Sequence, residues 1–200
     1  MKGSLIIVGF FVLGTICGVC HLLPFDIAET NISYYALCAL MFSVGLSVGN
    51  DPQTLKNFRS LNPRLVFLPI MTILGTLAGS AAVSLILTHR SITDCLAVGS
   101  GFGYYSLSSI FITEYKGAEL GTIALLANIS REILTLLAAP LLVRWCGNLA
   151  PISAGGATTM DTTLPIITRT AGQQFVVVSI FHGFVVDFSV PFLVTLFCSI

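Results

Sequence analysis

One apolar stretch, ELGTIALLANISREILTLLAAPLLV at residues 119–143, carries three strongly polar side chains close to its centre. They are Asn128, Arg131 and Glu132, and at about 100° per residue they share one narrow face of a helix. The stretch is long enough to cross the hydrocarbon core of a bilayer, which takes roughly 20 apolar residues. A charge at mid-depth costs several kcal/mol, so such groups face a partner or water. The stretch therefore predicts a transmembrane helix with a polar site at its middle.

Two interpretations of this polar face remain open from the residues alone. The functional interpretation is a site for a solute or a proton. The structural one is an ion pair between Arg131 and Glu132, although adjacent residues on a helix do not point directly at each other.

The composition of the whole chain agrees with a membrane protein. Of the 200 residues, 55% are hydrophobic and 9% are charged, whereas a soluble domain usually carries about 25% charged residues. The net charge is zero, so there is no basic face for nucleic acid, and no nucleic-acid partner is expected. The lipid bilayer is the expected surrounding.

The apolar blocks predict an all-α, polytopic membrane protein that forms a single transmembrane domain over residues 1–200. We expect about seven transmembrane segments, two of them broken or re-entrant. Their approximate bounds are 4–23, 32–48, 65–87, 92–115, 119–143, 148–168 and 173–198. The sequence leaves open whether 92–115 and 148–168 cross fully.

Small residues interrupt two of these segments, at 99–106 and at 154–161. A helix broken inside the membrane frees backbone groups, which only protein or a water-filled cavity can satisfy. In many secondary transporters two such breaks meet at the substrate site, and the alternative is close helix packing through small residues. We predict a binding role for the polar residues in and beside the breaks: Tyr104, Tyr105, Ser106, Thr158, Thr159 and Asp161.

Asp161 has two possible roles, which can coincide: a cap on a half-helix, or a carboxylate for a cation. In the last segment, His182 could relay protons or pack as a hydrogen-bonding group, and Asp187 is expected to be paired near mid-depth. Cys17-x-x-Cys20 reads as two small apolar core residues rather than a metal pair. No metal site, cofactor or catalytic residue is predicted.

Loop charges predict the orientation. Short cytoplasmic loops are enriched in Lys and Arg. Lys2 and the cluster of Lys56, Arg59 and Arg64 lie on one side if the first two segments form a hairpin. We therefore expect a cytoplasmic N-terminus and an outward-facing acidic loop at 24–31.

Five motifs in order along the chain resemble the bacterial lysine exporter family, LysO. They are GFGYYSLSS (101–109), Asn-x-x-Arg-Glu (128–132), GATTMDTTLP (156–165), Arg-Thr-x-Gly (169–172) and His-Gly-Phe (182–184). The resemblance implies export of L-lysine and its toxic analogues across the plasma membrane (the bacterial inner membrane), driven by proton antiport. It also implies that Glu132 matches an intramembrane acid important for transport, and that the protein is not an enzyme.

Full-length relatives carry about three further N-terminal spans with another functional acid. The resemblance therefore implies a split transporter, completed by a small second membrane subunit or by further copies of the chain. In the expected site Glu132 and Asp161 receive lysine's ammonium groups, freed amides or Arg131 receive its carboxylate, and the tyrosines wall its aliphatic stem. The alternatives are a transporter of another amino acid, an organic acid or a cation, and a non-transporting subunit. Intramembrane hydrolysis by paired Asp161 and Asp187 is a third, less favoured one.

Overall fold

The computed structural model describes residues 13, 16–17, 35, 63–87 and 89–200. The chain divides into two compact units, Met1–Ser47 and Val48–Ile200. The predicted segments 4–23 and 32–48 lie outside the described residues, apart from isolated positions within them. The fold given below is that of the second unit from residue 63 onward.

The described part of this unit is built from helices. Three helical stretches in it are long and apolar enough to cross a membrane, namely Leu65–Ser84, Ala118–Cys146 and Gln173–Ser199. This confirms the prediction of an all-α membrane protein. In chain order the elements are η2 (Pro63–Phe67), α4 (Leu68–Ser84), α5 (Ile92–Gly99), α6 (Tyr105–Lys116), α7 (Ala118–Cys146), α8 (Ala150–Gly155), η3 (Gly156–Met160), α9 (Leu164–Ala171), η4 (Gln173–Phe175) and α10 (Val176–Ser199).

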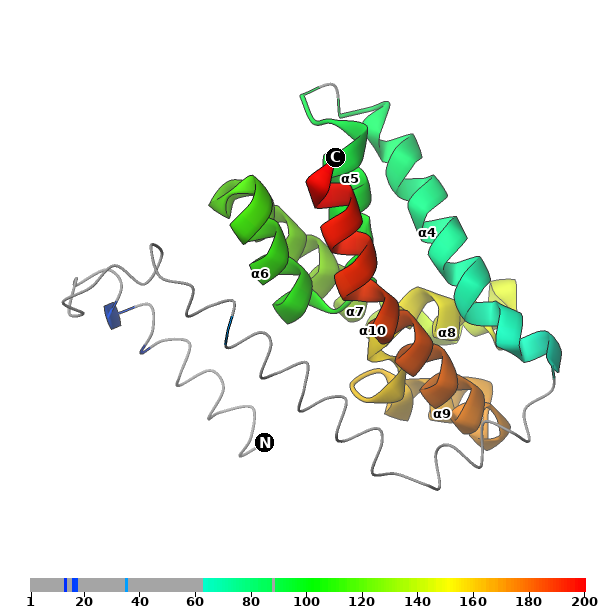
Figure 1. The fold of residues 1–200 in the computed structure, drawn as a ribbon. Helices are drawn as coiled ribbons and strands as arrows, with labels where there is room; N and C mark the ends of the chain where they lie inside the picture. Colours follow the sequence, from blue (N-terminus) through cyan, green and yellow to red (C-terminus); the bar gives the residue numbers. More distant parts are fainter. Residues whose placement is uncertain (1–12, 14–15, 18–34, 36–62, 88) are drawn as a thin grey trace. The chain divides into compact units, whose positions relative to one another are not determined.

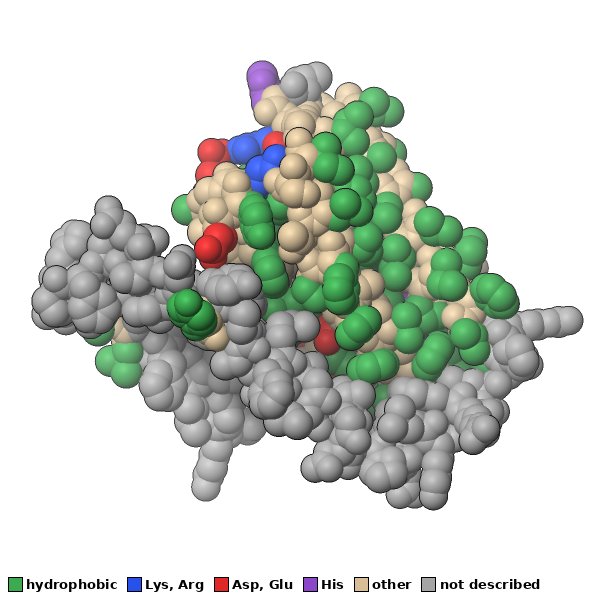
Figure 2. Space-filling view, in the orientation of Figure 1, with side chains coloured by type: hydrophobic (Ala, Val, Ile, Leu, Met, Phe, Trp, Pro, Cys, Tyr) green, Lys and Arg blue, Asp and Glu red, His purple; other side chains and the backbone are tan. Residues whose placement is uncertain are grey.

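The long helices turn apolar side chains outward. On α7, Leu126, Leu134 and Leu137 are exposed, whereas Gly121 and Asn128 are buried. This is the arrangement expected when the surrounding solvent is lipid and the helix contacts need small or polar residues. Figure 2 shows the same division, since charged side chains gather at one end of the visible face and the flank is apolar.

Helices α5 and α6 form a re-entrant hairpin. Two ion pairs join its two ends: Arg90, just before α5, pairs with Glu119 in the first turn of α7, and Asp94 pairs with Lys116 at 3.7 Å. Because both ends of the segment meet, residues 92–116 enter and leave at the same end of the bundle. We call this end, defined by these four residues, the ion-pair end.

Helices α8 and α9 form a second re-entrant hairpin. Ile152 of α8, Ala171 of α9 and Val178 of α10 belong to one buried cluster, against which Val143 of α7 and Leu68 of α4 also pack. We call this the cluster end. Since α7 is 29 residues long, its two ends lie about 43 Å apart at 1.5 Å per residue.

The two hairpins therefore enter from opposite ends of the bundle. A long helix followed by a hairpin occurs twice, as α4 with α5–α6 and as α7 with α8–α9, and the two copies run in opposite directions. In Figure 1 the C-terminal end of α10 lies beside α5, which places it at the ion-pair end. The structure thus resolves the crossing question for both interrupted segments: neither crosses fully.

Candidate functional site

Asn128 holds the tip of the first hairpin. Its side-chain oxygen accepts a hydrogen bond from the Gly103 amide at 2.8 Å, and its side-chain nitrogen donates to the carbonyls of Val98 (3.2 Å) and Ala124 (2.9 Å). The break between α5 and α6 frees backbone groups that lipid could not satisfy. A side-chain amide can pair with them because it both donates and accepts. The first residue of the predicted polar face of α7 therefore has a structural role.

Arg131 holds the second hairpin. Its Nε donates to the Ala154 carbonyl at 2.8 Å, and one Nη donates to the Ser153 carbonyl at 3.0 Å. These carbonyls end α8, where helix geometry leaves acceptors unpaired. The other Nη contacts the Thr76 hydroxyl of α4 at 3.3 Å, and the guanidinium lies 5.9 Å from the Phe102 ring centroid.

The structural alternative for this face, an ion pair between Arg131 and Glu132, is not formed. Within the described part of the chain, the ion pairs are the two at the ion-pair end. The Arg131 cation faces backbone carbonyls, and Glu132 is half-buried on a neighbouring strip of α7. The role of Glu132 in transport stays a prediction.

The two hairpin tips touch at mid-depth. The Ala157 amide donates to the Phe102 carbonyl at 2.9 Å. Phe102 is fully buried and has a positive φ of 47°, which is unusual for a bulky residue. Gly156, with φ 63°, faces the same carbonyl so closely that a Cβ would collide with it. The tips therefore fit together through a strained residue and an obligatory glycine.

His182 of α10 links the second hairpin tip to α4. Its Nε2 lies 2.9 Å from the Thr72 hydroxyl of α4, and its Nδ1 lies 3.2 Å from the Thr159 hydroxyl of η3. The imidazole is fully buried. Thr159 also donates to the Ser179 carbonyl at 2.9 Å. This geometry favours the packed, hydrogen-bonding role for His182.

A separate acidic group lies where α6, η3 and α10 meet. Asp187 of α10 is buried, Asp161 directly after η3 is exposed, and Tyr104 directly before α6 is half-buried. Asp161 accepts a hydrogen bond from the Thr162 amide at 2.5 Å, just before α9. Both roles considered for Asp161 therefore remain compatible with its position.

The remaining predicted residues divide between the tips and the surface. Thr158 is buried and donates to the Gly155 carbonyl at 2.9 Å, inside the second tip. Tyr105 and Ser106 are exposed in the first turn of α6. Sequence reasoning missed Thr72 and Thr76, although two threonines four residues apart on one face of an apolar helix were a usable signal.

A cavity of about 810 Å³ opens beside the tips, between α4, α5 and α7. Arg131, Asn128 and Thr76 lie at its deep end, and His89, Arg90 and Asp94 lie at the ion-pair end. The rest of its wall is largely apolar, with Val83, Val98 and Ile123 among the lining residues. It reaches from one end of the bundle to the mid-depth contact between the tips.

Two re-entrant hairpins that enter from opposite ends and meet beside the Arg131 guanidinium define a class of polytopic membrane protein built on broken helices. The profile of the family described as lysine exporter LysO matches residues 8–198 of this chain. The chain belongs to the LysO family of lysine exporters.

Two relatives show the extent of the similarity. The chain is 36% identical over 196 residues to the lysine exporter LysO of Escherichia coli K12, covering 98% of this chain and 64% of that protein. It is 34% identical over 196 residues to a protein of Haemophilus influenzae named a putative lysine exporter, covering 98% of this chain and 96% of that protein. The chain thus spans just under two thirds of the E. coli relative. No solved structure matches the chain.

Proposed function

We propose that this protein exports L-lysine and lysine analogues across the bacterial plasma membrane in exchange for protons. Family membership supports the substrate. The observation that carries the proposal is the meeting of two hairpin tips beside a helix, α10, that carries a buried acid, Asp187. Lysine carries one carboxylate and two ammonium groups, so its site needs hydrogen-bond donors for the first and acids for the second. The predicted second subunit or further copies of the chain stay a prediction.

The geometry favours backbone amides over Arg131 as receptors for the lysine carboxylate. Arg131 already donates to the carbonyls of Ser153 and Ala154. Helix α6 starts at Tyr105, directly after the tip of the first hairpin, with no side-chain cap on its first amides. Such an N-terminus attracts carboxylates. In this arrangement the carboxylate binds at the start of α6, and the ammonium groups bind at nearby acids.

The direct test is efflux of radiolabelled lysine from loaded proteoliposomes under an imposed proton gradient. We expect an acidic exterior to accelerate lysine loss. Unlabelled lysine analogues added inside should compete with the label, whereas citrate and alanine should not. Export of another solute without any lysine signal would replace the substrate, and efflux that ignores the gradient would remove the proton coupling.

Glu132→Gln should reduce proton-driven lysine efflux at least about tenfold while leaving the fold intact. Glu132 has no hydrogen bond or ion pair with the described part of the chain, so its loss should change the free energy of unfolding by less than about 0.5 kcal/mol. A carboxylate at mid-depth that does not stabilise the fold is available for transport. Wild-type efflux from a correctly folded variant would remove Glu132 from the mechanism.

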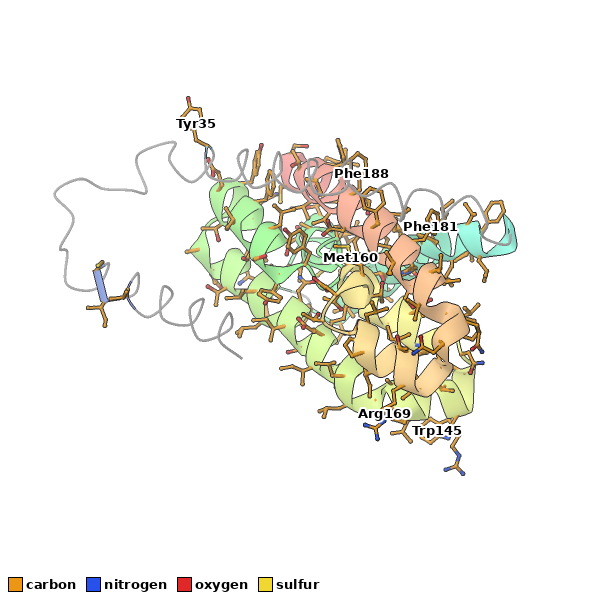
Figure 3. The ribbon with its side chains drawn as sticks, turned by 90° about the horizontal axis from the view of Figure 1, so that it is seen from below. Tyr35, Trp145, Met160, Arg169, Phe181 and Phe188 are labelled. Atoms are coloured by element: carbon orange, nitrogen blue, oxygen red, sulfur yellow. The ribbon has the colours of Figure 1, made fainter. Side chains whose placement is uncertain are left out.

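For the orientation, we propose that the cluster end faces the cytoplasm. Arg64, Arg144 and Arg169 belong to elements that begin or end there. In Figure 3 Arg169 and Trp145 lie at the edge of the view, away from Met160. Both basic residues that make ion pairs at the other end, Arg90 and Lys116, are matched by acids. The positive-inside rule then favours a cytoplasmic cluster end.

Cysteine labelling tests this orientation in intact cells. Cys146 is exposed at the cluster end. In a variant retaining Cys146 alone, a membrane-impermeant maleimide should react only after the cells are opened. A variant whose single cysteine comes from His89→Cys, at the ion-pair end, should react in intact cells. The reverse pattern would invert the orientation, and labelling of both in intact cells would contradict the opposite placement of these two ends.

A further inference from the structure

Asp187 is a buried carboxylate without a partner among the residues that the structure describes. It lies at the middle of α10, and only 7% of its surface is exposed. It takes part in neither ion pair of this part of the chain, and no hydrogen bond to it is found there. A charge in this position is costly in a membrane. No contact among the described residues compensates this charge, and the position of Asp187 therefore points to a ligand.

The neighbouring elements bring two more oxygen-bearing groups toward Asp187. Gly183, one turn earlier on α10, lets η3 approach so closely that a Cβ there would lie 2.7 Å from the Met160 amide. Asp161 follows Met160 directly in the chain. Tyr104 precedes the first residue of α6, which also packs against α10, and its neighbour Gly103 approaches Thr158 of η3, since a Cβ on Gly103 would lie 3.4 Å from the Thr158 methyl group. Three separate elements thus converge on one acidic spot.

We propose that Asp187, Asp161 and Tyr104 bind a primary ammonium group, with Asp187 as the deepest anchor. This inference rests on the proposed function and deepens it, since it assigns the place of an ammonium end of the substrate. Two carboxylates and a phenol offer oxygen acceptors to the three N–H donors of an ammonium, and the Tyr104 ring adds a face for cation–π contact. The ligand class is a primary alkylammonium, such as the side-chain end of a basic amino acid.

The alternatives fit these groups less well. A hard metal cation takes about six or more oxygen ligands, and within the described residues no group of three or more His, Cys, Asp or Glu side chains could hold a metal. Arg131 forms no ion pair with either carboxylate among the described residues, and its guanidinium donates to the carbonyls of Ser153 and Ala154 instead. Two carboxylates, one of them buried, favour a bound cation.

The probe for this site is 1,5-diaminopentane, which carries two primary ammonium groups and no carboxylate. Its binding to the purified full chain in detergent would be measured by calorimetry, with 1,5-pentanediol as the uncharged control. We expect Asp187→Asn to weaken diamine binding at least about tenfold, because a charge-assisted hydrogen bond is lost. The matched control is Glu114→Gln, which removes an exposed carboxylate from α6 and should leave the affinity within about twofold.

A second measurement needs no variant and covers the case in which Asp187→Asn fails to fold. A hydrophobic carbodiimide modifies buried carboxylates, and mass spectrometry locates the adduct. We expect diaminopentane to protect Asp187 in the wild-type protein and to leave Glu114 unprotected. Unchanged modification of Asp187, or unchanged affinity of a folded Asp187→Asn variant, would overturn the site.

The two proposals fail in different ways. Diamine binding that depends on Asp187, in a protein that does not export lysine, would support the ammonium site and refute the proposed function. Lysine export by wild-type protein, with diamine affinity and efflux unchanged in Asp187→Asn, would support the function and refute the site.

Discussion

Replacing Arg131 with methionine should destabilise the protein by about 3 kcal/mol and abolish lysine efflux. The guanidinium donates to two successive carbonyls at the end of α8, and methionine offers no donor to replace it. Each buried acceptor left unpaired costs about 1–3 kcal/mol. The second hairpin would lose its link to α7, and the contact between the tips would loosen. Thermal unfolding in detergent and efflux from proteoliposomes measure the two effects.

Two further variants isolate the cause. Arg131→Lys keeps the charge but loses the planar fork that reaches Ser153 and Ala154 together, so it should recover only part of the stability. Arg144→Met removes an exposed arginine near the end of the same helix and should change the free energy of unfolding by less than about 0.5 kcal/mol. An Arg131→Met protein as stable as the wild type would contradict the role of Arg131 in holding the hairpin.

Apolar length and interruption predicted the helices closely. The central stretch was expected at 119–143 and forms α7 at Ala118–Cys146. The first interruption was expected at 99–106, and the structure breaks the helix between Gly99 and Tyr105. These features are local, since a run of apolar residues fixes a span and a cluster of glycines allows a break.

The path of the chain after each break could not be read from the sequence. Nothing local distinguishes a helix that continues across the membrane from one that turns back, because both present the same apolar residues to lipid. The difference lies in contacts between distant residues, such as Arg90 with Glu119 and Asp94 with Lys116. Asp94 and Lys116 lie 22 positions apart in the sequence, so no local pattern connects them.

The contacts of the polar face of α7 could not be predicted from the sequence either. Helical geometry correctly grouped Asn128 and Arg131, but it could not say what they face. In the structure their partners are backbone groups of the two hairpins. The buried acid Asp187 comes from α10 instead, which packs closely against η3 just before Asp161. Polar residues on one helix therefore contact different hairpins, and the acids near the second break come from different elements.

The contact between the hairpin tips should be the most sensitive to substitution at Gly156. We expect Gly156→Ala to destabilise the protein by about 3 kcal/mol. Its φ of 63° and ψ of −126° lie in a region open almost only to glycine, which costs an alanine about 1–3 kcal/mol. In addition, the new Cβ would collide with the Phe102 carbonyl oxygen, which belongs to the backbone and already accepts the Ala157 amide at 2.9 Å. One hairpin must move for the methyl group to fit, so the variant should also transport lysine poorly.

Gly147→Ala is the matched control for the conformational cost of placing an alanine at a positive φ. Gly147 also has a positive φ, of 88°, yet no atom lies within 4 Å of the position that its Cβ would take. Its substitution should therefore cost only the conformational part, about 1–3 kcal/mol, and leave efflux close to that of the wild type. Equal destabilisation by the two alanines would mean that the tips do not press against each other. A larger loss at Gly156, accompanied by loss of efflux, would connect the contact between the two hairpins to transport itself.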